Sequence, residues 1–290
     1  MKTPAIHVEP LPSFLVIAAV ERALEEDMGR AGDLTTAATI PATAQARALL
    51  VSREKGRLAG TQFLRAAFNT LDPAVNVQIQ VPDGADVEPG ETIAIISGSA
   101  RPILTGERVG LNFLGRLSGV ATATSNLVRL VSGTGARVVC TRKTTPGLRA
   151  FEKYAVRCGG GFNHRFALDD GILIKDNHIV ACGGVRAAVE RARATAPHPL
   201  RIECEVTNTA ELTDALDAGA ELVLLDNMTP AQVADAAALA HARGVKVEVS
   251  GGITLATIRS YAEAGADLIS VGALTHSAPA VDIGLDFEPA

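Results

Sequence analysis

Residues 217–225 read DAGAELVLL, and residues 263–271 read EAGADLISV. Each stretch combines the end of a helical pattern, a glycine that can stop the helix, and a nearly continuous apolar run. Strands with continuous apolar character are typical of parallel sheets, which are buried on both faces. The similarity of the two stretches therefore predicts repeated strand–helix units built on a parallel sheet.

The same rhythm covers the chain after Gly135. Strand patterns occur at 137–142, 171–175, 200–206, 221–226, 245–250 and 267–271. Helical patterns lie between them, at 148–158, 184–195, 208–218, 230–243 and 254–264. Six such units predict an incomplete α/β barrel of six or seven strands over residues 115–278.

The first hundred residues lack this regular rhythm. Residues 75–81 alternate apolar and polar side chains, which predicts a strand with one solvated face. Further strand and helix patterns around them predict an N-terminal α+β domain over residues 1–114. The C-terminal tail, from about residue 279 to 290, is expected to pack on this domain.

Three local features of this region carry their own expectations. Ser13 is a candidate N-cap of a helix that stops at Gly29. The segment GDLTT at 32–36 reads as a polar turn. The helical pattern from 105 to 131 is expected to break into two helices at Gly119 and Thr122.

The composition excludes several classes of function. The 290-residue chain is 47% apolar and 20% charged and has no Trp, which argues against a surface on which nucleic-acid bases stack. The four cysteines form no CxxC pair, so reduced thiols and a cytoplasmic location are expected. The apolar run at 14–20 is too short to span a membrane. We expect neither nucleic acid nor a membrane as a partner.

Residues 141–178 form a cationic stretch. They hold seven Lys and Arg against four Asp and Glu, a net charge of +3 in a chain whose net charge is −5. A local patch of this kind suits a small anionic ligand, because nucleic acid needs a wide basic surface. Arg142 and Lys143 follow one predicted strand and Lys175 follows the next, so they can meet at the carboxyl edge of the sheet, where α/β proteins bind ligands.

The later strands add acids and glycines at the same edge. Residues 200–206 place Glu203 and Glu205 on one face, and Asp226 ends the next strand. Glu248 lies in the fifth strand, just before the glycine-rich turn at 250–252. We expect cations on one side of the edge, carboxylates on another and glycine turns on a third.

This set of groups fits a phosphorylated sugar and a Mg²⁺ ion. Glycine-rich turns that open helices bind phosphate through backbone N–H groups. Carboxylates bind hydroxyls and hard cations, and Arg binds carboxylates in a bidentate manner.

The motifs resemble those of the quinolinate phosphoribosyltransferases, also called nicotinate-nucleotide pyrophosphorylases (carboxylating). The resemblance runs nearly end to end, and the strings TRKTTPG and KDNH are its most specific parts. One departure is Cys140, where many members carry Asp. The matching strings are GDLTT (32–36), ER (107–108), LNFL (111–114), SGVAT (118–122), TRKTTPG (141–147), NHR (163–165), LIKDNH (173–178), LDNM (225–228), SGGI (250–253) and VGALTHS (271–277).

The resemblance implies an enzyme, a pentosyltransferase within the glycosyltransferases. Its reaction converts quinolinate and phosphoribosyl pyrophosphate to nicotinate mononucleotide, pyrophosphate and CO₂, with Mg²⁺, in NAD biosynthesis. It also implies an N-terminal α+β sandwich domain, an incomplete barrel, and a homodimer or higher oligomer whose active site is shared across the interface.

The resemblance also implies roles for individual residues. Lys143, Lys175, Glu205 and Asp226 would be catalytic, and Glu205 and Asp226 would meet the ribose hydroxyls and, directly or indirectly, the metal. Quinolinate would be bound by Thr141, Arg142, Lys143, His164, Arg165 and Lys175, with Arg108 from the second subunit. The ribose and phosphate would be bound by Glu205, Asp226, Ser250, Gly251, Gly252, Val271, Gly272, Ala273 and His276.

Other readings of the same residues stay open. A phosphoribosyltransferase of this fold could act on nicotinate or another small acid. The related protein of molybdenum-transport operons is a second alternative. A Schiff-base aldolase could use Lys175, although such a nucleophile needs a depressed pKa. A non-catalytic binding protein would also use a cationic pocket but would not need acids at 205 and 226.

Overall fold

The computed structural model describes residues 5–288. It divides the chain into two compact units. The first unit comprises the described residues up to Ser125, residues Ala150–Gly160 and the residues from Ser277 on, and the second comprises Asn126–Arg149 and Gly161–His276. Residue 114, at which the sequence analysis placed the domain boundary, lies inside helix α4 (Ala100–Leu130).

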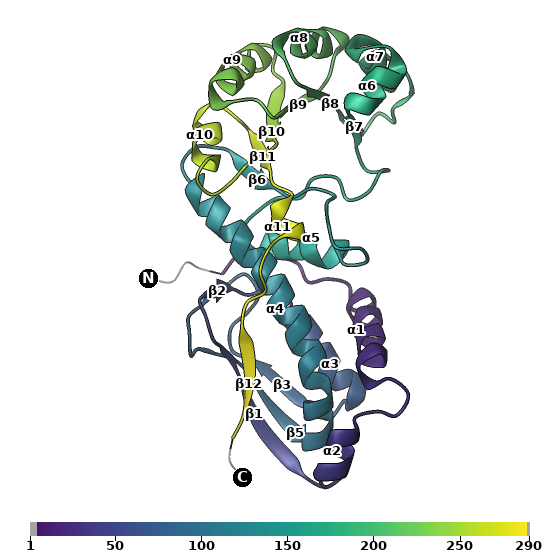
Figure 1. Ribbon diagram of the computed structural model, residues 1–290, viewed down its shortest axis with the longest axis vertical. Helices are drawn as coiled ribbons and strands as arrows, with labels where there is room; N and C mark the ends of the chain where they lie inside the picture. The colour runs from purple at the N-terminus through teal and green to yellow at the C-terminus, as the bar shows by residue number, and fades with distance from the viewer. Residues whose placement is uncertain (1–4, 289–290) are drawn as a thin grey trace. The chain divides into compact units, whose positions relative to one another are not determined.

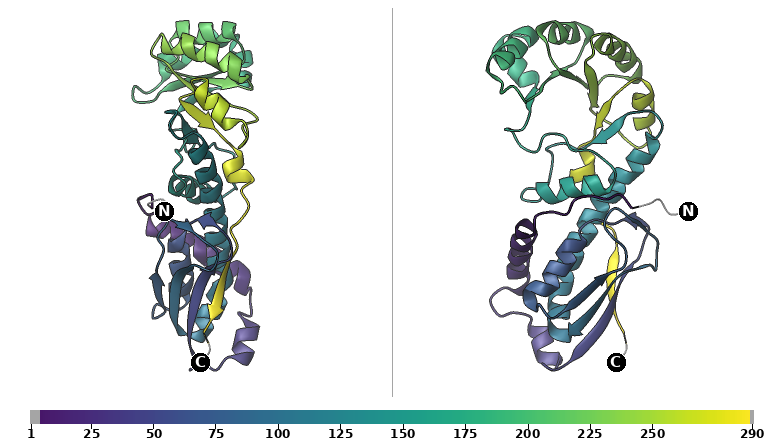
Figure 2. Two further views of the ribbon diagram at one scale, coloured as in Figure 1. Left: turned by 90° about the vertical axis from the view of Figure 1, so that its left-hand side faces the viewer. Right: turned by 180° about the vertical axis from the view of Figure 1, so that it is seen from behind.

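The first unit is built on an antiparallel sheet (Figures 1 and 2). Its strand order is β12-β1-β5-β3, and a two-stranded ribbon pairs β2 with β4. The strands are β1 (Gln45–Ser52), β2 (Gly56–Arg57), β3 (Asn76–Ile79), β4 (Asp86–Val87), β5 (Thr92–Ser99) and β12 (Ile283–Phe287), and the helices are α1 (Ser13–Met28), α2 (Leu34–Thr39), α3 (Thr61–Leu71), α4 and α5 (Arg149–Cys158). The predicted α+β class of this region is confirmed.

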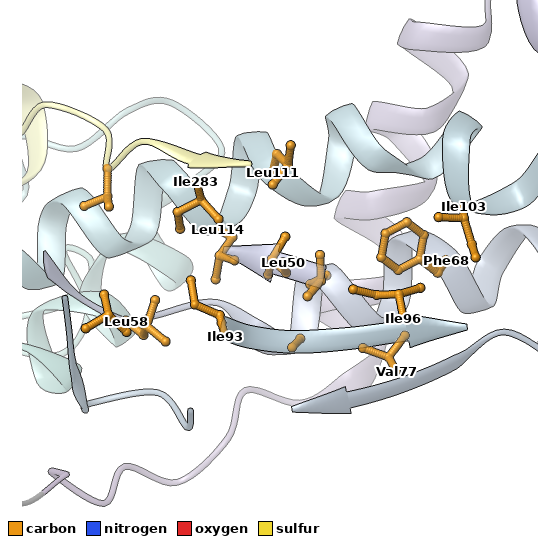
Figure 3. Packing of buried hydrophobic residues seen from close by; sticks show 14 of the residues in the cluster. Leu50, Leu58, Phe68, Val77, Ile93, Ile96, Ile103, Leu111, Leu114 and Ile283 are labelled. Atoms are coloured by element: carbon orange, nitrogen blue, oxygen red, sulfur yellow. The ribbon is translucent and has the colours of Figure 1, made fainter. Parts of the chain in front are cut away.

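Apolar side chains from the sheet and from two helices form the core of the first unit (Figure 3). Leu50, Ile93 and Ile96 come from the strands, Phe68 from α3 and Leu114 from α4, and each is fully buried. Burying an apolar side chain of this size stabilises a fold by roughly 1.5–3 kcal/mol. The core therefore fixes α3 and α4 on one face of the sheet.

The second unit is the predicted parallel sheet. Its six strands run in the order β6-β11-β10-β9-β8-β7, and all neighbouring pairs are parallel. The incomplete α/β barrel is thus confirmed, with the lower of the two predicted strand numbers. The strands are β6 (Arg137–Val139), β7 (Ile172–Ile174), β8 (Ile202–Val206), β9 (Leu222–Asp226), β10 (Lys246–Ser250) and β11 (Leu268–Ser270).

Helices follow the strands of this sheet, as Figure 1 shows for α7 to α10 around its outer side. They are α6 (Asp176–Cys182), α7 (Val185–Thr195), α8 (Thr209–Ala218), α9 (Pro230–His241), α10 (Ile258–Glu263) and α11 (Ala273–His276). The sheet does not close, because β6 and β7 each have one neighbour only among the described strands. Between them in sequence, Phe162 bridges to Val139 in parallel.

The expected break in the helix at Gly119 and Thr122 is wrong. Helix α4 is continuous for 31 residues, from Ala100 to Leu130. A Cβ atom at Gly119 would lie 1.9 Å from the carbonyl oxygen of Pro279, so the glycine permits a close backbone contact. The Thr122 hydroxyl donates to the Ser118 carbonyl at 2.7 Å and accepts the N–H of Arg57 at 2.8 Å. Both residues therefore serve packing within the first unit.

Helix α5 was expected among the barrel helices but belongs to the first unit. Polar contacts explain its place. The Tyr154 hydroxyl donates to Asp83 at 2.7 Å, and the fully buried Glu152 pairs with Arg116 at 2.7 Å. Burying these groups requires such partners, and the sequence pattern of a helix does not reveal them.

Two predictions on helix starts also need correction. The N-cap of α1 is Pro12, and Ser13 is the first helical residue. The segment at 32–36 is a helix start rather than a plain turn, because Asp33 caps α2 by accepting the N–H of Thr36 at 2.9 Å. Hydrogen bonds from Thr36 are the main reason why the pKa of Asp33 is lowered.

Within residues 5–288, none of the helices combines the length and the apolar character that crossing a membrane requires.

The close contact at Gly119 predicts a large effect of Gly119→Ala. The added methyl group would overlap the Pro279 carbonyl, and overpacking of this kind costs about 1–3 kcal/mol of unfolding free energy. Gly110→Ala in the same helix is the control, because its nearest atom, Cδ1 of Leu64 at 3.1 Å, ends a flexible side chain. Chemical denaturation should show a loss for Gly119→Ala alone, and equal effects at both sites would contradict this contact.

The four free thiols should differ in reactivity. Burial raises the pKa of Cys158 and of Cys204 to about 12, and Cys140 is also buried. Cys182 is partly exposed, with the guanidinium of Arg191 3.0 Å from its sulfur. Thiolates are the reactive form. Ellman's reagent at pH 8 should therefore label one thiol in the native protein and four in denaturant, and rapid native labelling of two or more would refute the burial.

Candidate active site

The ends of β6 and β11, which are neighbours in the sheet, bring Lys143 beside Gly272. The Thr275 hydroxyl donates to the Lys143 carbonyl at 2.7 Å, and the Thr141 hydroxyl accepts the Lys143 N–H at 3.0 Å. A Cβ atom at Gly272 would lie 3.2 Å from Cδ of Lys143 and 3.3 Å from Nε2 of His276. The lysine predicted near the pyrophosphate thus lies against the turn predicted to bind phosphate.

Lys175 follows β7 and pairs with a carboxylate of the next strand. Its Nζ lies 2.5 Å from Oε2 of Glu205, and its backbone N–H donates to Nδ1 of His178 at 3.0 Å, at the start of α6. The expected separation of cations and carboxylates is therefore wrong for this pair. Parallel neighbours β7 and β8 end side by side, and burial of Glu205, which is 8% exposed, favours a cation next to it.

Asp226 and Asn227 are fixed against the turn at 250–252. Asn227 has a positive φ of 54°, its amide donates to Oδ2 of Asp226 at 2.7 Å, and its N–H donates to the Ser250 carbonyl at 3.0 Å. A Cβ atom at Gly251 would lie 2.1 Å from Oδ1 of Asn227. Only glycine fits at that position, which also has a φ of +96°.

Arg142 and Arg165 have guanidinium groups that lack full pairing. In each, Nε is buried with no hydrogen-bond partner among the described residues. Arg165 donates from Nη1 to the Gly171 carbonyl at 2.9 Å. Its pKa is lowered by burial and by the positive charge of Arg142, whereas Glu203 and Asp170 raise it. Two neighbouring guanidinium groups in a partly buried place favour binding of an anion beside them.

His164 lies over two acids inside the barrel. Its Nε2 is 3.2 Å from Oε2 of Glu203 and 3.7 Å from Oε1 of Glu248. The pKa of Glu248 is raised to about 8, mainly by burial and next by the negative charge of Glu203. The alternation in residues 200–206 predicted that Glu203 and Glu205 share one face of the strand, but the sequence held no signal for the contact of Glu203 with His164.

These acids border a cavity of about 400 Å³ within the second unit. Its lining includes His164, Arg165, Glu203 and Glu248, and it reaches residues at the starts of the strands, such as Arg137 and Leu268. Lys143, Lys175, Glu205 and Asp226 do not line it. The cavity therefore lies deeper in the barrel than the carboxyl edge of the sheet.

Arg108 belongs to the first unit, in α4. With Asp33 and Thr105 it lines a separate cavity of about 380 Å³, where the Thr105 hydroxyl donates to Asp33 at 3.0 Å. Its predicted contribution to a partner's site stays a prediction, as do the roles of the other site residues.

The remaining residues of the predicted phosphate cradle follow β10 and β11. Gly252 has a φ of +61° and open space around its Cα atom, and Val271 is buried. Ala273 begins the short helix α11.

Cys140, the departure from the family pattern, lies with its sulfur 3.3 Å from Oδ1 of Asn163.

Comparison with known proteins agrees with this fold. Two family models match the chain: "Quinolinate phosphoribosyl transferase, N-terminal domain" over residues 33–118 and "Quinolinate phosphoribosyl transferase, C-terminal domain" over residues 120–286.

Two bacterial relatives and one solved structure are similar to the chain over most of its length. The "Probable nicotinate-nucleotide pyrophosphorylase [carboxylating]" of Bacillus subtilis is 44% identical over 261 residues, covering 90% of this chain and 89% of the relative. The Mycobacterium leprae protein with the name "Nicotinate-nucleotide pyrophosphorylase [carboxylating]" is 43% identical over 92% of this chain and 95% of its own length. The solved structure of the nicotinate-nucleotide pyrophosphorylase from Francisella tularensis superposes with a TM-score of 0.92 at 39% identity, over 99% of this chain and 100% of that one. The resemblance noted in the motifs is confirmed: the chain belongs to the quinolinate phosphoribosyltransferase family.

Proposed function

We propose that this protein transfers phosphoribosyl from phosphoribosyl pyrophosphate to the ring nitrogen of quinolinate and decarboxylates the product. The products are nicotinate mononucleotide, pyrophosphate and CO₂, in the de novo synthesis of NAD. The observation that carries the proposal is the pair Arg142 and Arg165, whose buried Nε groups have no hydrogen-bond partner within residues 5–288. The names of its relatives support the same reaction.

Charge distinguishes quinolinate from nicotinate as the substrate. Quinolinate is a dianion at neutral pH, and each carboxylate needs its own cationic partners when it leaves water. Arg142 and Arg165 can bind one carboxylate, and Lys175 near the end of β7 can approach the other. We assign Thr141, Lys143 and His164 to the same pocket, and Arg108 to the pocket of a partner subunit in a homodimer.

We assign the sugar phosphate to the carboxyl ends of β8 to β11. The turn at 250–252 and the turn at 271–273 would bind the 5′-phosphate through backbone N–H groups, with His276 beside them. Glu205 and Asp226 would accept hydrogen bonds from the ribose hydroxyls. Lys143, next to Gly272, would neutralise the pyrophosphate.

The acids of this edge also fit a Mg²⁺ ion. Mg²⁺ prefers oxygen ligands and usually retains several waters, so one or two carboxylates suffice. Asp226 is bound only at one oxygen in the contacts above, whereas Glu205 already pairs with Lys175, so Asp226 is the better placed of the two. When bound, Mg²⁺ neutralises the charge that develops on pyrophosphate.

The residues then serve two bond changes. The ring nitrogen attacks C1 of the ribose, and the C1–O bond breaks with its electron pair leaving on pyrophosphate. Glu205 and Asp226 stabilise the positive charge that develops on the sugar. The bond from C2 to the carboxylate then breaks, the electron pair remains on the pyridinium ring, CO₂ departs, and C2 takes a proton.

We also propose a cytoplasmic location. The support is that all four cysteines are free thiols, as expected of a reducing compartment.

Release of labelled CO₂ tests the reaction. Quinolinate labelled in its 2-carboxylate, phosphoribosyl pyrophosphate and Mg²⁺ should release label in step with nicotinate mononucleotide, and a chelator should stop both. Nicotinate is the matched control substrate and should yield no nucleotide. Nucleotide from nicotinate without turnover of quinolinate would overturn the substrate assignment while leaving the phosphoribosyl chemistry.

Replacing Arg165 with Gln should affect one substrate selectively. A hydrogen bond to a charged group contributes about 1.5–3 kcal/mol, so kcat/KM for quinolinate should fall about 10- to 100-fold. The KM for phosphoribosyl pyrophosphate should stay within about twofold. Arg186→Gln, which removes surface ion pairs to Asp214 and Asp217, is the control and should change neither. Equal losses for both substrates would contradict the placement of Arg165.

A further inference from the structure

Two buried acids in the second unit have no part in the reaction described above. Glu203 is 5% exposed and Glu248 is 1% exposed, and each has one carboxylate oxygen, Oε1, that is buried without a hydrogen-bond partner in the part of the chain that the structure describes. Buried carboxylates are unfavourable without a partner, so their presence calls for a specific contact.

That contact is the imidazole of His164. Its Nε2 lies 3.2 Å from Glu203 and 3.7 Å from Glu248. On the other side of the ring, Nδ1 accepts the backbone N–H of Arg165 at 2.7 Å. An acceptor nitrogen carries no hydrogen, so the ring hydrogen lies on Nε2 and points at Glu203. Both ring nitrogens are therefore engaged, and the ring cannot turn without breaking a contact.

His164 begins the segment that carries Arg165. Arg165 follows it directly and donates from Nη1 to the Gly171 carbonyl at 2.9 Å. Asp170 accepts the N–H groups of Phe166 at 2.5 Å and Ala167 at 2.9 Å. Residues 164–171 thus form a loop with its own internal hydrogen bonds. The contact of His164 with the two acids fixes the start of this loop to strands β8 and β10.

We propose that Glu203 and Glu248 are positioning residues that hold His164, and through it Arg165, for binding of the substrate's carboxylate. The role deepens the proposed function, on which it rests for the identity of the carboxylate. Glu203 contacts the ring directly, whereas Glu248 supports Glu203 from β10. Neither acid touches the substrate.

The geometry also allows a competing use of the same atoms. A nitrogen of His164 and one oxygen of each acid lie within 4.8 Å of one another, which is close enough to hold a divalent cation. A metal would bind Nε2 in place of its hydrogen, so the two arrangements exclude each other. A metal on Nε2 would leave the ring hydrogen on Nδ1, where it would meet the N–H of Arg165, so this contact favours the positioning role.

Steady-state kinetics of three variants provide the first test. Glu203→Leu removes the acceptor and should raise the KM for quinolinate at least tenfold, with the KM for phosphoribosyl pyrophosphate within about twofold. Glu203→Gln keeps a carbonyl acceptor for Nε2–H and should restore the KM for quinolinate to within about threefold of the native value. Glu190→Leu, on the exposed face of α7, is the matched control and should change neither constant.

Nuclear magnetic resonance of protein with ¹⁵N-labelled histidine provides a test that needs no turnover. His164→Asn identifies the His164 signals. The native ring should show a hydrogen on Nε2 that exchanges slowly with water, because Glu203 accepts it. This protection should be lost in Glu203→Leu but remain in Glu203→Gln. If leucine prevents folding, Glu203→Met, which keeps an unbranched chain of similar length, gives the same comparison.

The outcomes separate this inference from the proposed function. Failure of the native protein to use quinolinate would defeat the proposed function, while the histidine spectra would still test the anchoring of the ring. Turnover of quinolinate with an unchanged KM in Glu203→Leu would overturn the positioning role. A stoichiometric transition metal found by elemental analysis, and lost in Glu203→Gln, would also overturn it.

Discussion

Charge burial at the carboxyl edge of an open parallel sheet is the constraint on which this site depends. Glu205 is paired with Lys175 at that edge, and deeper in the barrel Glu203 and Glu248 each have an oxygen near Nε2 of His164. In the part of the chain that the structure describes, Arg142 and Arg165 retain buried Nε groups without a hydrogen-bond partner. An excess of unpaired cationic hydrogen-bond donors at one place prepares the site for an anion before that anion arrives.

The apolar periodicity of the second unit made its fold predictable. The runs at 221–226 and 267–271 are strands at almost those residues, because only a sheet buried on both faces accepts such continuous apolar sequence. The same pattern predicted that Lys143 and Lys175 follow two strands of this sheet, and they lie after the ends of β6 and β7. The motifs supplied the family, and with it the substrate, which the residue pattern alone left open.

Contacts between distant residues were not predictable from local pattern. Helix α5 has an ordinary helical sequence, yet the bonds of Tyr154 to Asp83 and of Glu152 to Arg116 place it in the first unit. Gly119 has the composition of a helix break, but its lack of a side chain serves the contact with Pro279. The pairing of Lys175 with Glu205 likewise depends on which strands are neighbours.

The edge position of β12 has a consequence for how the chain folds as it is made. β12 follows the second unit in sequence and pairs with β1, which begins at Gln45, so the sheet of the first unit gains this edge strand only after the second unit has been synthesised. Until then, β1 presents a free edge of unpaired N–H and C=O groups, which is a site for aggregation. Most of the second unit lies between these two strands in sequence, so it can fold before they pair. Its folding shortens the effective loop between β1 and β12, which lowers the entropic cost of pairing them.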